Sequence, residues 1–114
     1  MSIQTINPTT NKVIESFLEM TEVKVHEAVE KASSAYESWK KTDYKLIPAL
    51  LHKVAGLLRD KEDLLANMIT LEMGKLMAHA EGEIKLSAKI FDYYANNAES
   101  YLADKMLHPT HGQA

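Results

Sequence analysis

Histidines and carboxylates are the residues of this chain that could bind a metal ion or act as general acids and bases. The sequence has five histidines and 16 Asp and Glu residues. No histidine follows a glutamate by three residues, as a helical di-iron site requires, and no two histidines are four residues apart, as in a helical zinc site. Glu81 and Glu83 are two residues apart and cannot share one face of a helix. The spacing therefore predicts neither a metal centre of these types nor a catalytic pair of carboxylates.

Nucleophiles and phosphate-binding loops are also missing from the pattern. The sequence contains no cysteine, which excludes disulfides, thiolate metal sites and a cysteine nucleophile within these residues. Its four glycines, at positions 56, 74, 82 and 112, are too far apart for a glycine-rich phosphate loop. Trp39, Tyr93 and Tyr94 are expected in the core and not as a stacking platform. We therefore expect no catalytic residue and no cofactor-binding residue in this chain.

Composition limits the class of partner. The formal net charge of −3 and the 25% of charged residues give no basic face, so nucleic acid is not an expected partner. No apolar run approaches the roughly 20 residues that span a bilayer, and the N-terminus lacks the basic and apolar regions of a signal peptide. We expect no membrane association and a cytoplasmic location.

The elements that would position these residues begin with two extended segments. Ser2 to Ile6 and Lys12 to Leu18 flank "NPTTN", whose proline and polar side chains favour a turn, and this predicts a β-hairpin within residues 1–20. Thr21 is suited to begin a helix that runs from about 22 to 41. Its apolar residues recur at helical spacing and predict one buried face: Val25, Ala28, Val29, Ala32, Tyr36 and Trp39.

Three more helices are expected. The second begins near Ile47, because Pro48 is tolerated only in a first turn, and the polar run "RDKED" (59–63) separates it from a third helix that Gly74 ends. The fourth runs from Met77 to about Asp104. Two series with a seven-residue spacing form one apolar seam along it: Met77, Ile84, Phe91 and Ala98, and Ala80, Ser87, Tyr94 and Tyr101.

The expected fold is mainly α, an N-terminal β-hairpin followed by about four helices. Residues 1–114 form a single partial domain, with the hairpin in 1–20, a helical region in 21–105 and an irregular tail in 106–114.

Four segments in this order carry a family resemblance: "INPTTNKVI", "AVEKASSAYESW", "LLANMITLEMGKLMAHAEGEI" and "DYYANNAE". The chain resembles the N-terminal quarter of the aldehyde dehydrogenase superfamily, where these elements belong to the α/β cofactor domain. Within the superfamily it is most similar to the succinate-semialdehyde dehydrogenase group. The resemblance covers essentially the whole chain.

The resemblance implies oxidation of an aldehyde to an acid with NAD or NADP, through a cysteine nucleophile and a glutamate base. Those family residues lie beyond Ala114, so we expect a chain truncated before the cofactor-binding and catalytic regions and inactive by itself. The small aldehyde substrate, which for this group is succinate semialdehyde, and the cofactor would bind only to the full-length enzyme. The identity of the aldehyde and the choice between NAD and NADP stay open.

The resemblance also places two sites. It implies that Gly82 and Leu86 line the substrate tunnel, although both could simply be helix-packing residues. It implies a monovalent cation held by the carbonyl groups of Thr5 and Ile6 and by the carboxylate of Glu72. A carboxylate in the last turn of a helix faces the negative end of the helix dipole and needs compensation. The alternative to the cation is a salt bridge from Glu72 to Lys75 or another lysine.

Uncovered apolar surface predicts self-association. The sides of the second and fourth helices that would meet the missing sheet have no partner, so the chain is expected to form a homo-oligomer through helix 77–104. Residues expected on the open surface are Leu50, Leu57, Ile84, Phe91 and Tyr94. A truncated gene product that acts as a self-associating helical interaction protein is therefore the alternative function. A third hypothesis, an unrelated helical binding module, would require the four ordered motifs to be coincidental.

Overall fold

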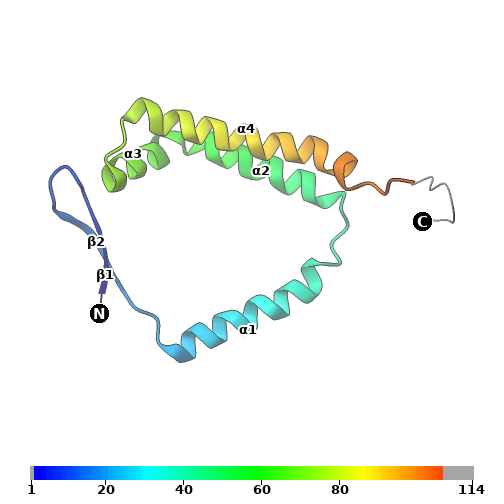
Figure 1. The fold of residues 1–114 in the computed structure, drawn as a ribbon, viewed down its shortest axis with the longest axis horizontal. Coiled ribbons are helices and arrows are strands. Elements are labelled where there is room, and N and C mark those ends of the chain that lie inside the picture. The colour runs from blue at the N-terminus through cyan, green and yellow to red at the C-terminus, as the bar shows by residue number, and fades with distance from the viewer. Residues whose placement is uncertain (1, 107–114) are drawn as a thin grey trace.

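A β-hairpin followed by four helices makes up the computed structural model, which describes residues 2–106 (Figure 1). The chain matches the expected, mainly helical fold class. The tail expected at 106–114 lies outside the described residues except for Met106. The elements are β1 (Ser2–Ile6), β2 (Val13–Leu18), α1 (Glu22–Trp39), α2 (Leu46–Asp60), α3 (Glu62–Met73) and α4 (Met77–Leu102).

The hairpin forms where turn chemistry predicts it. The strands are antiparallel, with Thr5 opposite Glu15, and the register shifts by one residue between Thr5 and Ile6. In the turn, the Asn7 side-chain oxygen accepts hydrogen bonds from the backbone N–H groups of Thr9 and Thr10, at 2.9 and 3.2 Å. Asn11 closes the turn with a φ of 55°, a conformation that asparagine tolerates better than most residues.

Helix α1 begins as expected but buries no residue. The Thr21 hydroxyl accepts a hydrogen bond from the backbone N–H of Lys24, which caps the helix. The apolar face is open along its length, with Val29 62% and Trp39 55% exposed. The prediction of a buried face is therefore wrong within this chain. Amphipathic spacing shows which side of a helix suits burial, and here no other described element covers that side.

Helices α2 and α3 are almost continuous. Only Lys61 separates them, so the break expected across 59–63 is reduced to a single residue. Lys, Arg and Glu are good helix formers, and a polar run of them need not interrupt a helix. Pro48 is the third residue of α2, within the first turn as expected. Gly74 ends α3 in the left-handed conformation, with a φ of 67°, and its N–H bonds the carbonyl of Thr70.

Helix α4 packs lengthwise against α2, antiparallel to it, and against α3 (Figure 1). The buried side chains of this unit are mostly small: Ala55, Ala66, Ala80, Ile84, Ala88 and Ala95. The seven-residue seam is thus only partly correct, since Ala80 and Ile84 are buried while Tyr94 and Tyr101 are exposed. The first three buried positions of α4, Ala80, Ile84 and Ala88, are four residues apart, and steps of four let the row drift away from a strict heptad along a straight helix.

Large side chains stay on the surface. The aromatic residues expected in the core, Trp39, Tyr93 and Tyr94, are each about half exposed. Leu50 and Leu57 are exposed as expected, Phe91 is half-buried, and Ile84, expected on open surface, is buried. No large side chain among the described residues is fully buried, because close approach of alanine-lined helices leaves a thin core.

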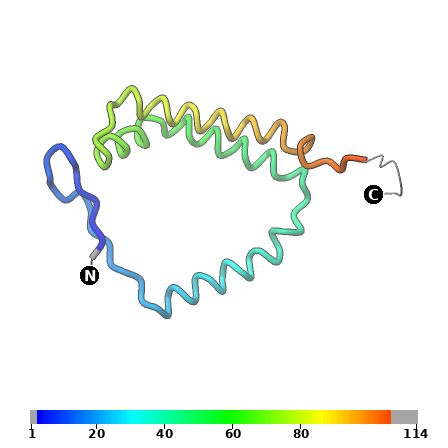
Figure 2. Tube along the Cα trace, viewed as in Figure 1, coloured from blue at the N-terminus to red at the C-terminus, as the bar shows by residue number. Residues whose placement is uncertain are grey.

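The chain follows an open frame (Figure 2). Its radius of gyration is 20.8 Å, whereas a compact domain of this length has about 13 Å. The hairpin, α1 and the α2–α4 unit occupy different sides of the frame and share few contacts. None of the helices within residues 2–106 combines the length and apolar composition needed to cross a bilayer.

Candidate functional site

The end of β1 and the end of α3 carry the residues for which a cation was predicted. The Thr5 hydroxyl oxygen is buried and has no hydrogen-bond partner among the described residues. It lies next to the register shift that begins at Ile6. An unpaired buried oxygen is uncommon, because it has lost its hydrogen bonds to water without replacement.

Contact between Pro8 and Gly74 brings the hairpin turn to the end of α3. A Cβ atom added at Gly74 would lie 2.9 Å from Cγ of Pro8, so the proline ring lies directly against the glycine. Glycine at this position therefore serves two purposes, a left-handed backbone and close approach of the turn. The contact places the hairpin and the helix end that carries Glu72 in one region of the molecule.

Glu72 is exposed and forms no ion pair or hydrogen bond with a described residue. Lys75, the nearest lysine along the chain, pairs with Glu83 of α4 instead. The salt bridge from Glu72 to Lys75 is thus wrong. The last turn of α3 has no basic residue, so nothing described compensates the carboxylate at the negative end of the helix.

Gly82 and Leu86 occupy successive turns of α4. Both are exposed, and a Cβ atom added at Gly82 would meet nothing within 4 Å. Neither residue takes part in the packing of α4 against α2 and α3, whose buried row contains Ala80, Ile84 and Ala88. Among the described residues, neither Gly82 nor Leu86 is buried, so the choice between a packing residue and a tunnel-lining residue stays a prediction.

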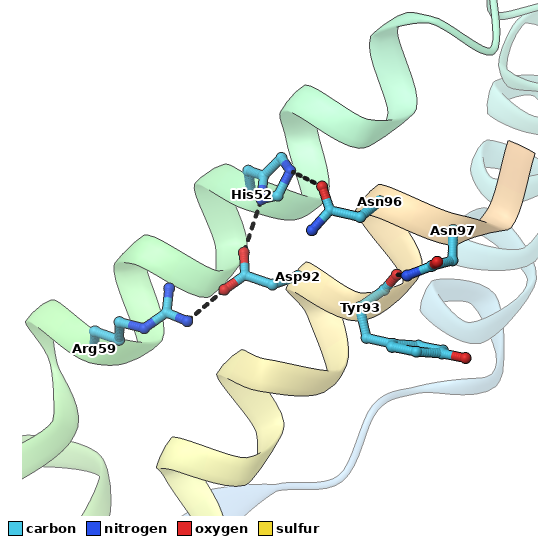
Figure 3. Close-up of polar contacts among 6 residues, drawn as sticks. All are labelled: His52, Arg59, Asp92, Tyr93, Asn96 and Asn97. Atoms are coloured by element: carbon cyan, nitrogen blue, oxygen red, sulfur yellow. Dashed lines mark hydrogen bonds and ion pairs between the residues drawn. The ribbon is translucent and has the colours of Figure 1, made fainter.

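A polar cluster between α2 and α4 is the most extensive side-chain network in the described residues, and the sequence did not reveal it (Figure 3). Asp92 accepts hydrogen bonds from His52 Nδ1, at 2.7 Å, and from Arg59. Asn96 lies 3.2 Å from His52 Nε2 through its side-chain oxygen. His52 and Asp92 are 40 residues apart in sequence. Only the antiparallel pairing of α2 with α4 brings them together.

Asp92 is held in its ionised form by these neighbours. Two hydrogen bonds lower the pKa of Asp92 below its ordinary value. The bond from Arg59 has the larger effect and the bond from His52 the next largest. The contacts at His52 suit the doubly protonated ring, or the Nδ1–H tautomer with the Asn96 amide turned over.

The cluster links α2 to α4 through hydrogen bonds, but its geometry does not suit activation of a nucleophile. A histidine next to a carboxylate can activate a hydroxyl or thiol, provided that the second ring nitrogen faces that nucleophile. Here Asn96 occupies that side of the ring, and Arg59 neutralises the carboxylate. No group of three or more metal-ligating side chains occurs within residues 2–106. The cluster joins α2 to α4 across one side of the pair.

The chain belongs to the aldehyde dehydrogenase family, because residues 1–113 match the sequence profile of that family. It corresponds to the N-terminal part of these proteins and spans about a quarter of the length of the relatives that it matches.

Two curated relatives and one solved structure define the similarity. The chain is 34% identical over 110 residues to the succinate-semialdehyde dehydrogenase (NADP+) of Deinococcus radiodurans, covering 96% of this chain and 23% of that protein. It is 38% identical over 105 residues to succinate-semialdehyde dehydrogenase (NADP+) 1 of Mycobacterium bovis, covering 92% and 23%. The succinic semialdehyde dehydrogenase from Streptococcus pyogenes, solved in complex with NADP+, superposes with a TM-score of 0.88 at 40% identity, covering 96% and 24%.

Proposed function

We propose that this chain provides the N-terminal part of an aldehyde dehydrogenase that oxidises succinate semialdehyde to succinate with NAD or NADP. The observation that carries the proposal is the match of 92 to 96% of the chain to succinate-semialdehyde dehydrogenases at 34 to 38% identity. The names of these relatives favour NADP+ as the acceptor. In the overall reaction, water supplies an oxygen atom to the aldehyde carbon, a hydride passes to the nicotinamide and protons are released. The cytoplasmic location is part of the proposal.

The chain by itself is expected to be inactive. Its 114 residues include no cysteine, and the described residues bring together no nucleophile with a base. The contribution of these residues is structural, a hairpin and four helices whose open faces suit packing against further protein.

A chimera tests this proposal. Residues 1–113 would replace the matching segment of the Deinococcus radiodurans relative, and NADPH formation would be measured with succinate semialdehyde. We expect an active chimera, no turnover by the isolated chain, and none by the relative lacking the segment. The kcat/KM preference for succinate semialdehyde over an uncharged aldehyde should also be kept. A folded but inactive chimera, or one that has lost this preference, would contradict the proposal.

Gly82 and Leu86 form part of the substrate-tunnel wall in this proposal. Their exposure on one side of α4 supports the assignment, because that side is free to meet substrate or further protein. In the chimera, Leu86→Trp should raise KM for succinate semialdehyde severalfold, whereas Lys89→Trp on the same helix should not. Equal effects of the two substitutions would remove Leu86 from the tunnel wall.

A monovalent cation bound by the backbone oxygens of Thr5 and Ile6 and by Glu72 is the second part of the proposal. The uncompensated Glu72 carboxylate and the unpaired Thr5 hydroxyl support it. K⁺ or Na⁺ should raise the melting temperature of the chimera more than tetramethylammonium at equal ionic strength, and Glu72→Gln should abolish the difference. Equal responses to the three salts would contradict the site, and Glu30→Gln, which alters an exposed carboxylate of α1, is the control.

A further inference from the structure

The polar cluster of Figure 3 joins α2 and α4 through contacts that alternate along the two helix axes. His52 and Arg59 of α2 are separated by about 10 Å along its axis, at 1.5 Å per residue, and both donate to Asp92. His52 in turn lies between Asp92 and Asn96, which are one turn apart on α4. Each helix therefore holds one side chain of the other between two of its own side chains.

Other axial positions of α4 would not satisfy these contacts. A slide of α4 along α2 by four residues, about 6 Å, would keep nearly the same side of the helix toward its partner. In one direction Ala88 would take the place of Asp92, and in the other direction Asn96 would take it. Neither residue has a carboxylate, so Arg59 would lose its ionised partner in both cases. Of these positions, only the observed one satisfies the polar cluster.

Apolar packing discriminates less between the same positions. In the first direction, the places of the buried residues of α4 would be taken by the residues four positions earlier. All of these are apolar, although not matched in size: Leu76, Ala80, Ile84 and Phe91. Hydrophobic burial is non-directional, whereas hydrogen bonds require defined distances and angles. Fixing the register of paired helices is the best-attested effect of polar groups at such a contact.

Two ion pairs near the other end of α4 define its position less closely. Lys85 pairs with Glu62 of α3 at 3.1 Å. Lys75, which lies between α3 and α4, pairs with Glu83. A lysine carries its charge on a flexible four-carbon stem and can follow a partner that has moved. The polar cluster instead brings a rigid guanidinium group and a histidine ring to one carboxylate.

We infer that the polar cluster fixes the axial position of α4 on α2, with Asp92 as the positioning residue. It thereby also sets where Gly82 and Leu86 stand along the substrate tunnel, a step that rests on the proposed function. Leu86 precedes Asp92 by about 9 Å on the same helix, so a slide of α4 by about 6 Å would carry Leu86 the same distance. A displacement of about 1 Å can already weaken a contact that positions a substrate.

A distance between α2 and α4 tests this position directly. Because the chain has no cysteine, Lys53→Cys and His79→Cys, both at exposed positions, can each carry one spin label. Double electron–electron resonance on the labelled 114-residue chain should give one narrow distance distribution. Asp92→Ala should add a second population about 6 Å shorter, because His79 would take the place of Glu83, nearer to Lys53. Glu99→Ala, which removes a carboxylate of α4 outside the cluster, should leave the distribution unchanged.

Two further variants separate position from stability. Asp92→Glu keeps the carboxylate and should restore the single distance. Arg59→Gln, which keeps Asp92 but removes its arginine partner, should give the shorter population as Asp92→Ala does. A single unchanged distance in Asp92→Ala or Arg59→Gln, with the helical circular dichroism signal intact, would overturn the inference. A broad distribution with loss of that signal would show that the cluster stabilises the helices without selecting a position, and would overturn it too.

The chimera with the Deinococcus radiodurans relative tests the consequence for substrate. There Asp92→Ala should raise KM for succinate semialdehyde severalfold and change kcat less, while KM for NADP+ stays the same. Asp92→Glu should recover most of the loss, and Glu99→Ala should cause none. An active chimera in which Asp92→Ala leaves KM for succinate semialdehyde unchanged would overturn the positioning of the tunnel wall. An inactive chimera would contradict the proposed function alone, because the distance measurement requires no activity.

Discussion

At the scale of single residues, the His52, Arg59 and Asp92 cluster gives the described structure its clearest electrostatic feature. The carboxylate of Asp92 receives two cationic or potentially cationic donors at the contact between α2 and α4. The neighbours lower its pKa, so they bind the ionised form more strongly than the neutral one. A pKa that is lower in the folded state makes folding stability depend on pH.

Asp92 should therefore stabilise the α2–α4 pair near neutral pH and lose that effect in acid. Its stabilisation is complete well above the ordinary pKa of 3.8 and declines as pH falls below that value toward the folded-state pKa. Asp92→Asn should lower the melting temperature at pH 7, and the difference from wild type should shrink below about pH 4. Melting curves over this range measure both quantities. Asp104→Asn, which alters an exposed carboxylate beyond α4, is the control; an equal pH effect there would refute the role of Asp92.

At the scale of elements, the sequence predicted the features that depend on neighbouring residues. It did not predict the contacts between helices that are far apart in the chain. The hairpin turn and the Gly74 helix end depend on residues next to them, so Asn7, Pro8 and Gly74 revealed them in the sequence. The pairing of His52 with Asp92 depends on the packing of two helices from distant parts of the chain, and no spacing rule reports it. The prediction of a salt bridge between Glu72 and Lys75 was wrong because Lys75 pairs with Glu83, which lies in α4.

Alanine substitutions at Gly74 and Gly56 should have opposite effects on stability, because only Gly74 has a left-handed backbone and a close neighbour. Gly74→Ala should destabilise the chain by about 1–2 kcal/mol, since alanine is strained at a φ of 67° and its Cβ would press on Pro8. Gly56→Ala, inside α2 with nothing near its Cβ, should instead stabilise by about 0.5–1 kcal/mol. Urea unfolding, followed by the near-ultraviolet signal of the α4 tyrosines, measures both. If adding Pro8→Ala restored no stability to Gly74→Ala, the contact would contribute nothing beyond backbone strain.

At the scale of the whole molecule, the open frame leaves apolar side chains of α1, α2 and α4 exposed, among them Val29, Leu57 and Ile90. The radius of gyration of 20.8 Å reflects this uncovered surface, because a single chain cannot close the frame with its own described elements.

The frame also predicts that the chain does not unfold as one cooperative unit. Helix α1 is 18 residues long and buries none of them, so it lacks the tertiary packing that supplies most of the stability of helices in proteins. The α2–α4 unit has its own core and polar cluster. Trp39, the single tryptophan, lies at the end of α1, whereas three of the five tyrosines, Tyr93, Tyr94 and Tyr101, lie in α4.

Heating should therefore change tryptophan fluorescence at a lower temperature than the near-ultraviolet tyrosine signal of α4. Ile90→Lys should leave the α1 transition in place, because Ile90 lies in α4 and α1 buries no residue against the described chain. Asp92→Asn should lower only the second transition, since its contacts lie between α2 and α4. Coincident transitions for the two signals would show that α1 is packed against the rest of the protein in solution.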